Sequence, residues 1–91
     1  MLLETTLMEW EWLIDTIGWI GSIEVVVAYG LVSYNKIEAE SLGYQILNLT
    51  GGLFLIINTY YYAAYPSTFI NVVWLFIALF AIIKMFRKPK K

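Results

Sequence analysis

Glu24 is the one ionisable side chain that lies deep inside an apolar stretch of this sequence, residues 17–33. On a helix, its neighbours along the same face are small: Gly21 and Ala28, with Gly18 and Ser22 close by. A carboxyl group among apolar side chains costs free energy. It therefore marks a site for a proton, a cation or a substrate, or else a hydrogen-bonded tie between helices. The sequence leaves both interpretations open.

Polar and small residues recur every three or four positions in two further apolar stretches, 42–63 and 66–86. In the first stretch they are Gln45, Asn48, Gly51 or Gly52, Leu55, Asn58 and Tyr62. In the second they are Ser67, Asn71, Trp74, Ala78 and Ala81. Such stripes are typical of helices that pack closely in a membrane, where small residues allow approach and amides form hydrogen bonds.

The two stripes give two sets of candidate residues. The candidate substrate contacts are Asn71, Asn58, Trp74 and Glu24; Asn58 and Asn71 lie on inward stripes near the same outer leaflet, which favours a shared cavity. The candidate helix-packing residues are Gly18, Gly21, Gly51, Gly52, Gln45, Asn48 and Ala78.

Each of the three apolar stretches is about as long as a bilayer's hydrocarbon core requires, because twenty helical residues rise about 30 Å. We therefore predict an all-α membrane protein with three transmembrane helices at about 17–33, 42–63 and 66–86. Residues 1–16 are acidic and rich in tryptophan, which suits an interfacial lead-in. Thr6 and Glu9 match a capping box and predict a helix start, with a loosely ordered tail as the alternative. Ser41 is placed to cap the second helix, and Pro66 to begin the third.

The composition excludes several function classes. Hydrophobic residues make up 60% of the 91-residue chain and charged residues 14%, and cysteine and histidine are absent. Disulfides, thiol chemistry and the usual zinc ligands are therefore excluded. No nucleophile–base pair, metal-ligand cluster or phosphate-binding loop is visible, so we expect no enzyme activity, no metal and no cofactor. A short basic tail beside a membrane span does not indicate nucleic-acid binding.

Charge is distributed unevenly along the chain. Acidic residues gather near the N-terminus, at Glu4, Glu9, Glu11 and Asp15. Basic residues gather at the C-terminus, at Lys84, Arg87, Lys88, Lys90 and Lys91. Since positive charge is retained on the cytoplasmic side, the pattern predicts a cytoplasmic tail at 87–91, a cytoplasmic 33–41 loop and an external N-terminus.

Several motifs resemble those of a family of small, largely uncharacterised bacterial three-span membrane proteins. The matching segments are Ile17-Gly18-Trp19-Ile20-Gly21-Ser22, Ala28-Tyr29-Gly30-Leu31-Val32-Ser33, Tyr44-Gln45-Ile46-Leu47-Asn48, Gly51-Gly52, Tyr61-Tyr62, Pro66-Ser67 and Asn71-Val72-Val73-Trp74. The resemblance covers roughly residues 17–83. It implies a location in the bacterial inner membrane and supplies no activity.

The third stretch also resembles, more distantly, the SemiSWEET sugar transporters, three-span bacterial proteins that dimerise around a central pocket. Pro66 is followed by Asn71 and then Val72-Val73. The asparagine at this place lines the sugar pocket in SemiSWEETs, so the resemblance gives Asn71 a substrate role. The chain departs from that family at two places, because Tyr29-Gly30 stands where a Pro-Gln hinge is found and Leu55 where a pocket tryptophan is found.

These observations lead to one favoured hypothesis and two alternatives. The favoured one is a homodimeric, SemiSWEET-like transporter of a small neutral solute. The first alternative is an accessory or scaffold subunit that packs beside another membrane protein. The second is an ion-conducting oligomer with a ring of Glu24 carboxyl groups.

Overall fold

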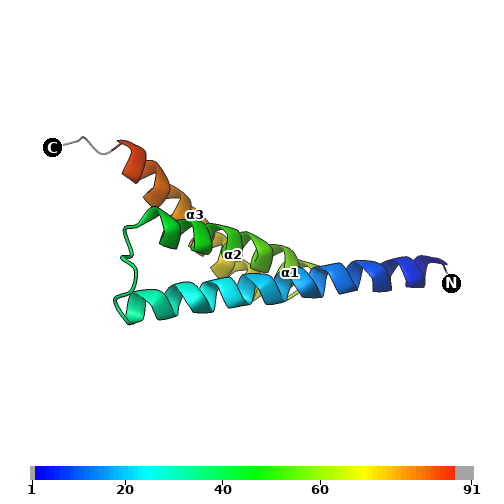
Figure 1. Cartoon of the computed structure of the whole chain (residues 1–91). Coiled ribbons are helices and arrows are strands. Elements are labelled where there is room, and N and C mark those ends of the chain that lie inside the picture. Colours follow the sequence, from blue (N-terminus) through cyan, green and yellow to red (C-terminus); the bar gives the residue numbers. More distant parts are fainter. Residues whose placement is uncertain (1, 88–91) are drawn as a thin grey trace.

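The computed structural model describes the backbone of residues 2–87 and the side chains of residues 9–87, and this part of the chain is all-helical. Three helices follow one another along it: α1 (Leu2–Ser33), α2 (Leu42–Tyr61) and α3 (Tyr65–Arg87) (Figure 1). The predicted all-α class is confirmed. Of the predicted basic tail, 87–91, all but Arg87 lies outside the described residues.

α1 is longer than the apolar pattern alone predicts. It begins at Leu2 and continues through residues 1–16 into the apolar stretch without a break. The helix start predicted at Thr6 is therefore wrong, and the lead-in is a continuation of the first helix. At about 1.5 Å per residue, a helix of 32 residues measures about 48 Å, well beyond the thickness of a hydrocarbon core.

Both connections between helices are fixed by local backbone geometry. The Ser41 hydroxyl accepts a hydrogen bond of 3.2 Å from the Tyr44 N–H, which confirms the predicted cap of α2. Asn35 lies two residues beyond the end of α1 and Ala63 two residues beyond the end of α2, each at a φ of 61°. The flanking backbone hydrogen bonds form the Schellman pattern at both ends. The chain can therefore reverse direction within a few residues after each helix.

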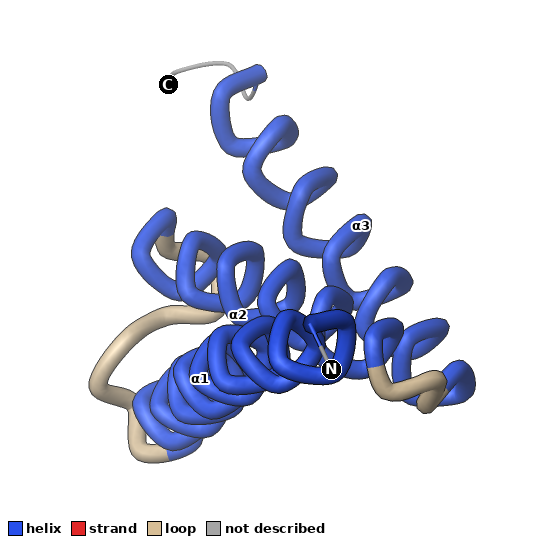
Figure 2. The backbone as a smooth tube through the Cα atoms, turned by 90° about the vertical axis from the view of Figure 1, so that its right-hand side faces the viewer, coloured by secondary structure: helices blue, strands red, loops and turns tan. Residues whose placement is uncertain are grey.

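α2 is the central helix. It packs against α1 along one face and against α3 along another, whereas α1 and α3 do not approach each other in the described part of the chain. Figure 2 shows α3 diverging from α1. The turn between α2 and α3 is tied by a hydrogen bond of 2.8 Å that Thr68 donates to Thr59.

The buried positions are few and mostly small, and most large apolar side chains lie outside. The buried residues are Ile14, Gly18, Gly21, Ala28, Gln45, Asn48, Gly51, Gly52 and Ala78. By contrast, Val26 and Phe69 are each 69% exposed, and Phe80 is 64% exposed. Apolar surface of this extent would be unfavourable in water and is compatible with a lipid environment.

Two of the described helices are long and apolar enough to cross a membrane, over Glu9–Ser33 and Tyr65–Arg87. α2 is not one of them, because the amides Gln45, Asn48 and Asn58 lower its hydropathy. Length and composition therefore support membrane association of the protein through α1 and α3.

Candidate functional site

Glu24 lies at the interface of α1 and α2, where it contacts a side chain that the sequence pattern did not single out. The Thr50 hydroxyl donates a hydrogen bond of 2.8 Å to Glu24 Oε2 and lies 3.0 Å from the Ile46 carbonyl. Glu24 Oε1 is buried and has no hydrogen-bond partner within the described part of the chain. One carboxyl oxygen therefore accepts a hydrogen bond across the interface. The other is removed from solvent without gaining a hydrogen bond, which costs free energy.

Two glycines bring Glu24 this close to α2. A Cβ added at Gly21 would lie 2.9 Å from the Gly51 carbonyl oxygen, and one added at Gly51 would lie 3.1 Å from the Gly21 carbonyl oxygen. Backbone meets backbone here, which is the contact that small residues permit between membrane helices. The added Gly51 Cβ would also lie 3.4 Å from Glu24 Cβ, so the crossing point and the carboxyl group are adjacent.

Asn58 forms a second polar contact between the same two helices, closer to the α2–α3 turn. Its side-chain Nδ2 donates a hydrogen bond of 3.0 Å to the Ile14 carbonyl of α1. It lies directly over Gly18, where an added Cβ would collide with the amide. Thr50 and Asn58 are eight residues apart on α2, so the two contacts are separated by about 12 Å along the helix.

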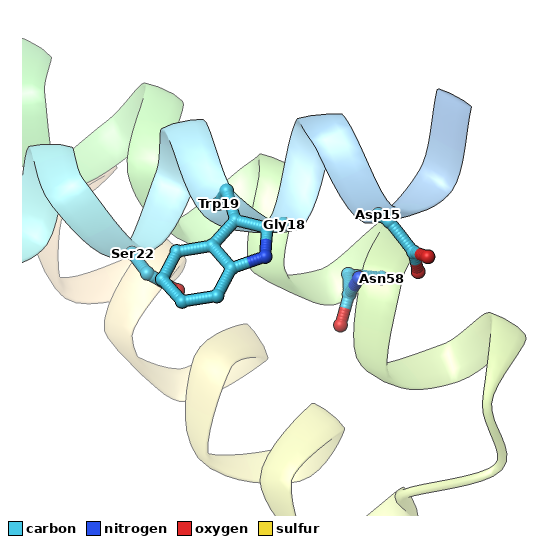
Figure 3. Close-up of a pocket in the computed structure, with 5 residues that line it drawn as sticks. All are labelled: Asp15, Gly18, Trp19, Ser22 and Asn58. Atoms are coloured by element: carbon cyan, nitrogen blue, oxygen red, sulfur yellow. The ribbon is translucent and has the colours of Figure 1, made fainter. Parts of the chain in front are cut away.

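A small open cavity of about 190 Å³ lies beside Asn58. Its lining residues are Asp15, Gly18, Trp19, Ser22 and Asn58 (Figure 3). The lining therefore combines a carboxylate, a hydroxyl, an amide and an indole, and Figure 3 shows the amide of Asn58 between the Trp19 ring and Asp15. This arrangement offers hydrogen-bond partners beside an aromatic face.

Tyr62, in the turn just beyond α2, closes one end of this region by donating a hydrogen bond to Asp15 Oδ1. This hydrogen bond is the main cause that raises the pKa of Tyr62 to about 12. The phenol therefore stays protonated to well above neutral pH and remains the hydrogen-bond donor to Asp15, at the mouth of the cavity.

The other predicted substrate residues lie on the opposite side of α2. The Asn71 carbonyl oxygen would be 3.8 Å from a Cβ added at Gly52, and the Asn71 side chain is half-buried. Trp74 is 42% exposed. Within one chain, Glu24 and Asn58 therefore lie where α1 meets α2, whereas Asn71 lies where α2 meets α3. The four residues do not form one pocket.

The residues predicted to pack helices lie at both interfaces of α2, the one with α1 and the one with α3. Gly18, Gly21 and Gly51 lie where α1 meets α2, and Gly52 lies against Asn71 and Leu75 of α3. Gln45, Asn48 and Ala78 are buried, and Gln45 Nε2 donates a hydrogen bond of 2.9 Å to the Ala39 carbonyl in the loop.

Sequence reasoning did not propose Asp15, Trp19 or Thr50 as site residues. It named Ser22 only as a neighbour of Glu24, and Tyr62 only as a member of the polar stripe. Asp15 was grouped with the other N-terminal acids, although it lies four residues before Trp19, one helical turn away and on the same face. No group of three or more acidic side chains suited to a metal ion occurs in the part of the chain that the structure describes.

Over residues 2–87 the chain is thus all-helical, and two of its helices are long and apolar enough to cross a membrane. A model of an uncharacterised protein family matches residues 14–89, and the chain belongs to this family. No curated protein and no solved structure matches it significantly.

Proposed function

We propose that the chain is an integral membrane protein with three spans, in which α2 crosses the bilayer between α1 and α3. Its 20 residues rise about 30 Å, which is the length required. The polar residues that lower its hydropathy are turned inward, since Gln45 and Asn48 are buried. The large side chains that it exposes before its final turn are apolar: Leu42, Ile46, Leu53 and Ile57.

A labelling experiment tests the span of α2. The chain has no cysteine, so single cysteines at Glu38, in the loop before α2, and at Ser67, at the start of α3, are unique reporters. We expect a membrane-impermeant maleimide added to intact cells to label S67C, and to label E38C only after permeabilisation. The same outcome would place the last turn of α3, which carries Lys84 and Arg87, on the cytoplasmic face of the inner membrane. That is the side on which positive charge is retained. Labelling of both positions from one side would show that α2 does not cross.

We further propose that copies of the chain assemble to carry a small neutral solute. The observation that carries this proposal is the open cavity of about 190 Å³ lined by Asp15, Trp19, Ser22 and Asn58. An aromatic face beside hydroxyl, amide and carboxylate groups is suited to a hydroxylated solute, whose C–H groups lie on the ring while its hydroxyls bond the polar groups. SemiSWEETs have a pocket tryptophan where this chain has Leu55, and Trp19 supplies an indole from α1 instead.

The separation of α1 from α3 is the reason for proposing an assembly. The cavity is open in one chain, and α1 and α3 leave part of each other's surface uncovered. In a two-fold pair, α3 of one copy closes the open side of the cavity in the other. This arrangement brings Asn71 and Trp74 to the cavity, as the SemiSWEET resemblance implies.

Uptake by proteoliposomes tests the transport proposal. Reconstituted protein of verified orientation is expected to take up small polyols or sugars above the liposome background. Loss of the aromatic face in Trp19→Ala removes about 1.4 kcal/mol of binding, so we expect about tenfold weaker uptake at low substrate concentration. The matched control is Trp12→Ala, because Trp12 is 71% exposed and does not line the cavity. Background rates for every solute in the panel would reject transport.

One observation favours a second function, that of an accessory subunit. Ala78 is the only buried residue in α3, whereas Phe69, Ile70, Ile77 and Phe80 are exposed. A helix with so little contact inside its own chain is suited to packing against another membrane protein. Recovery of one defined partner in a pull-down from native membranes, together with absent uptake, would favour this function over transport.

A further inference from the structure

A second cavity, of about 380 Å³, lies at the other end of the molecule from the cavity beside Asn58. It is lined by Ala39 and Glu40 of the loop, by Gln45 of α2, and by Ala81, Lys84 and Met85 of α3. Figure 1 shows the loop and the C-terminal end of α3 at this same end of the molecule. A volume of this size would hold about a dozen water molecules, which is room for a small charged group.

Two opposite charges line this cavity. Glu40 comes from the loop and Lys84 from the last turns of α3, and in the described part of the chain no ion pair joins them. Each charge is therefore free to meet a group of the opposite sign placed between them. The remaining walls, Ala39, Ala81 and Met85, are apolar.

A buried amide positions the acidic side of the cavity. Gln45 is only 9% exposed, and its Nε2 donates a hydrogen bond of 2.9 Å to the Ala39 carbonyl. Ala39 directly precedes Glu40, so this hydrogen bond holds the loop residue that carries the carboxylate. A loop is otherwise the most variable part of a helical hairpin, and its attachment to α2 indicates that Glu40 has a defined place.

We propose that this cavity binds the headgroup of a zwitterionic phospholipid with a primary ammonium group, the chemistry of phosphatidylethanolamine. Lys84 faces the phosphate, and Glu40 accepts hydrogen bonds from the ammonium group. The apolar walls contact the glycerol and the first methylenes of the acyl chains. The cavity lies at a helix end where the α3 lysine can extend to the membrane surface, which is where phospholipid headgroups are found.

The site discriminates between headgroups by charge and by hydrogen bonding. A trimethylated ammonium, as in phosphatidylcholine, has no N–H to donate to Glu40. Phosphatidylglycerol has no ammonium at all, so Glu40 would repel it. The inference does not depend on transport, and it holds equally for an accessory subunit in the same membrane.

Native mass spectrometry of the full chain, in detergent with equimolar phosphatidylethanolamine, phosphatidylcholine and phosphatidylglycerol, tests the proposal. We expect severalfold preferential retention of phosphatidylethanolamine. Glu40→Gln is expected to abolish that preference over phosphatidylglycerol, and Lys84→Gln to lower retention of all three lipids about fivefold. Water-soluble phosphoethanolamine is expected not to compete at millimolar concentration, since it lacks the apolar part.

Matched controls separate a site from general surface charge. Glu38→Gln alters an acid in the same loop and Arg87→Gln alters a base at the same helix end, and neither residue lines this cavity. Both variants are expected to retain lipids like the unmodified protein. The proposal is overturned if the three lipids are retained equally, or if Arg87→Gln has the same effect as Lys84→Gln. Full competition by soluble phosphoethanolamine would overturn the assignment to a lipid.

Discussion

Replacing Gly21 with leucine is expected to separate α1 from α2 and to lower the free energy of unfolding by about 3 kcal/mol. Even a Cβ at this position would lie 2.8 Å from Phe54 Cβ and 2.9 Å from the Gly51 carbonyl oxygen. The second of these atoms belongs to the backbone and cannot move without shifting the helix. A leucine therefore cannot be accommodated by a change of rotamer, and the two helices must move apart.

The measurement is a titration of the detergent-solubilised protein with SDS. Energy transfer between dyes at positions 12 and 60 reports the closed hairpin, because both residues are exposed and lie at the same end of α1 and α2. Gly30→Leu is the matched control: it is in the same helix, and a Cβ added there meets nothing within 4 Å. Gly30→Leu is expected to stabilise slightly, because leucine has the higher helix propensity. Equal midpoints for the two variants would contradict the close crossing at Gly21.

The contacts between α1 and α2 could have been predicted more fully from the sequence than they were. In an antiparallel hairpin, contacting residues lie at nearly equal distances on either side of the loop. Glu24 and Thr50 are 26 residues apart and are centred on Ile37 in the loop. Applied to Glu24, this symmetry selects the turn of α2 that carries Thr50. The other features of the hairpin can also be predicted from the sequence: the apolar stretches predict the two helices, Ser41 predicts the start of α2, and the glycines predict the close contact between them.

Which neighbouring helix each of the amides Asn58 and Asn71 meets could not be predicted. Asn58 and Asn71 were both assigned to inward stripes near one leaflet, and that spacing is compatible with a single cavity. A central helix is contacted on two faces, however, and a stripe of period three to four cannot show which neighbour it meets. Asn58 bonds α1, while Asn71 belongs to α3. Only the placement of α2 between its neighbours separates the two residues.

Replacing Glu24 with methionine is expected to stabilise the protein by about 1 kcal/mol and, where the carboxyl group serves transport, to abolish uptake of the solute. Among the residues that the structure describes, Glu24 Oε1 is buried without a hydrogen-bond partner, so we expect the carboxyl group to be a net cost to folding. Methionine has a similar length and removes that cost. The Thr50 hydroxyl keeps a hydrogen-bond acceptor in the Ile46 carbonyl, 3.0 Å away.

The matched comparison is Thr50→Val. In the natural background it removes the one bond to Glu24 and is expected to destabilise by about 1 kcal/mol, within the range measured for hydrogen bonds between membrane helices. Combined with Glu24→Met it should have almost no further effect, because the bond is already lost. Unfolding titrations of the four proteins give this coupling energy directly.

The two readouts together separate the roles that the sequence left open for Glu24. If the carboxyl group were a structural tie, Glu24→Met would destabilise the hairpin, and activity would fall only as the folded fraction falls. If it serves transport, stability rises while uptake is lost, since a costly buried polar group is retained where function requires it. An ion-conducting oligomer predicts a third result, in which Glu24→Gln abolishes conductance and Asn71→Ala does not. The sign of the stability change is therefore the observation that distinguishes a helix tie from a working carboxyl group.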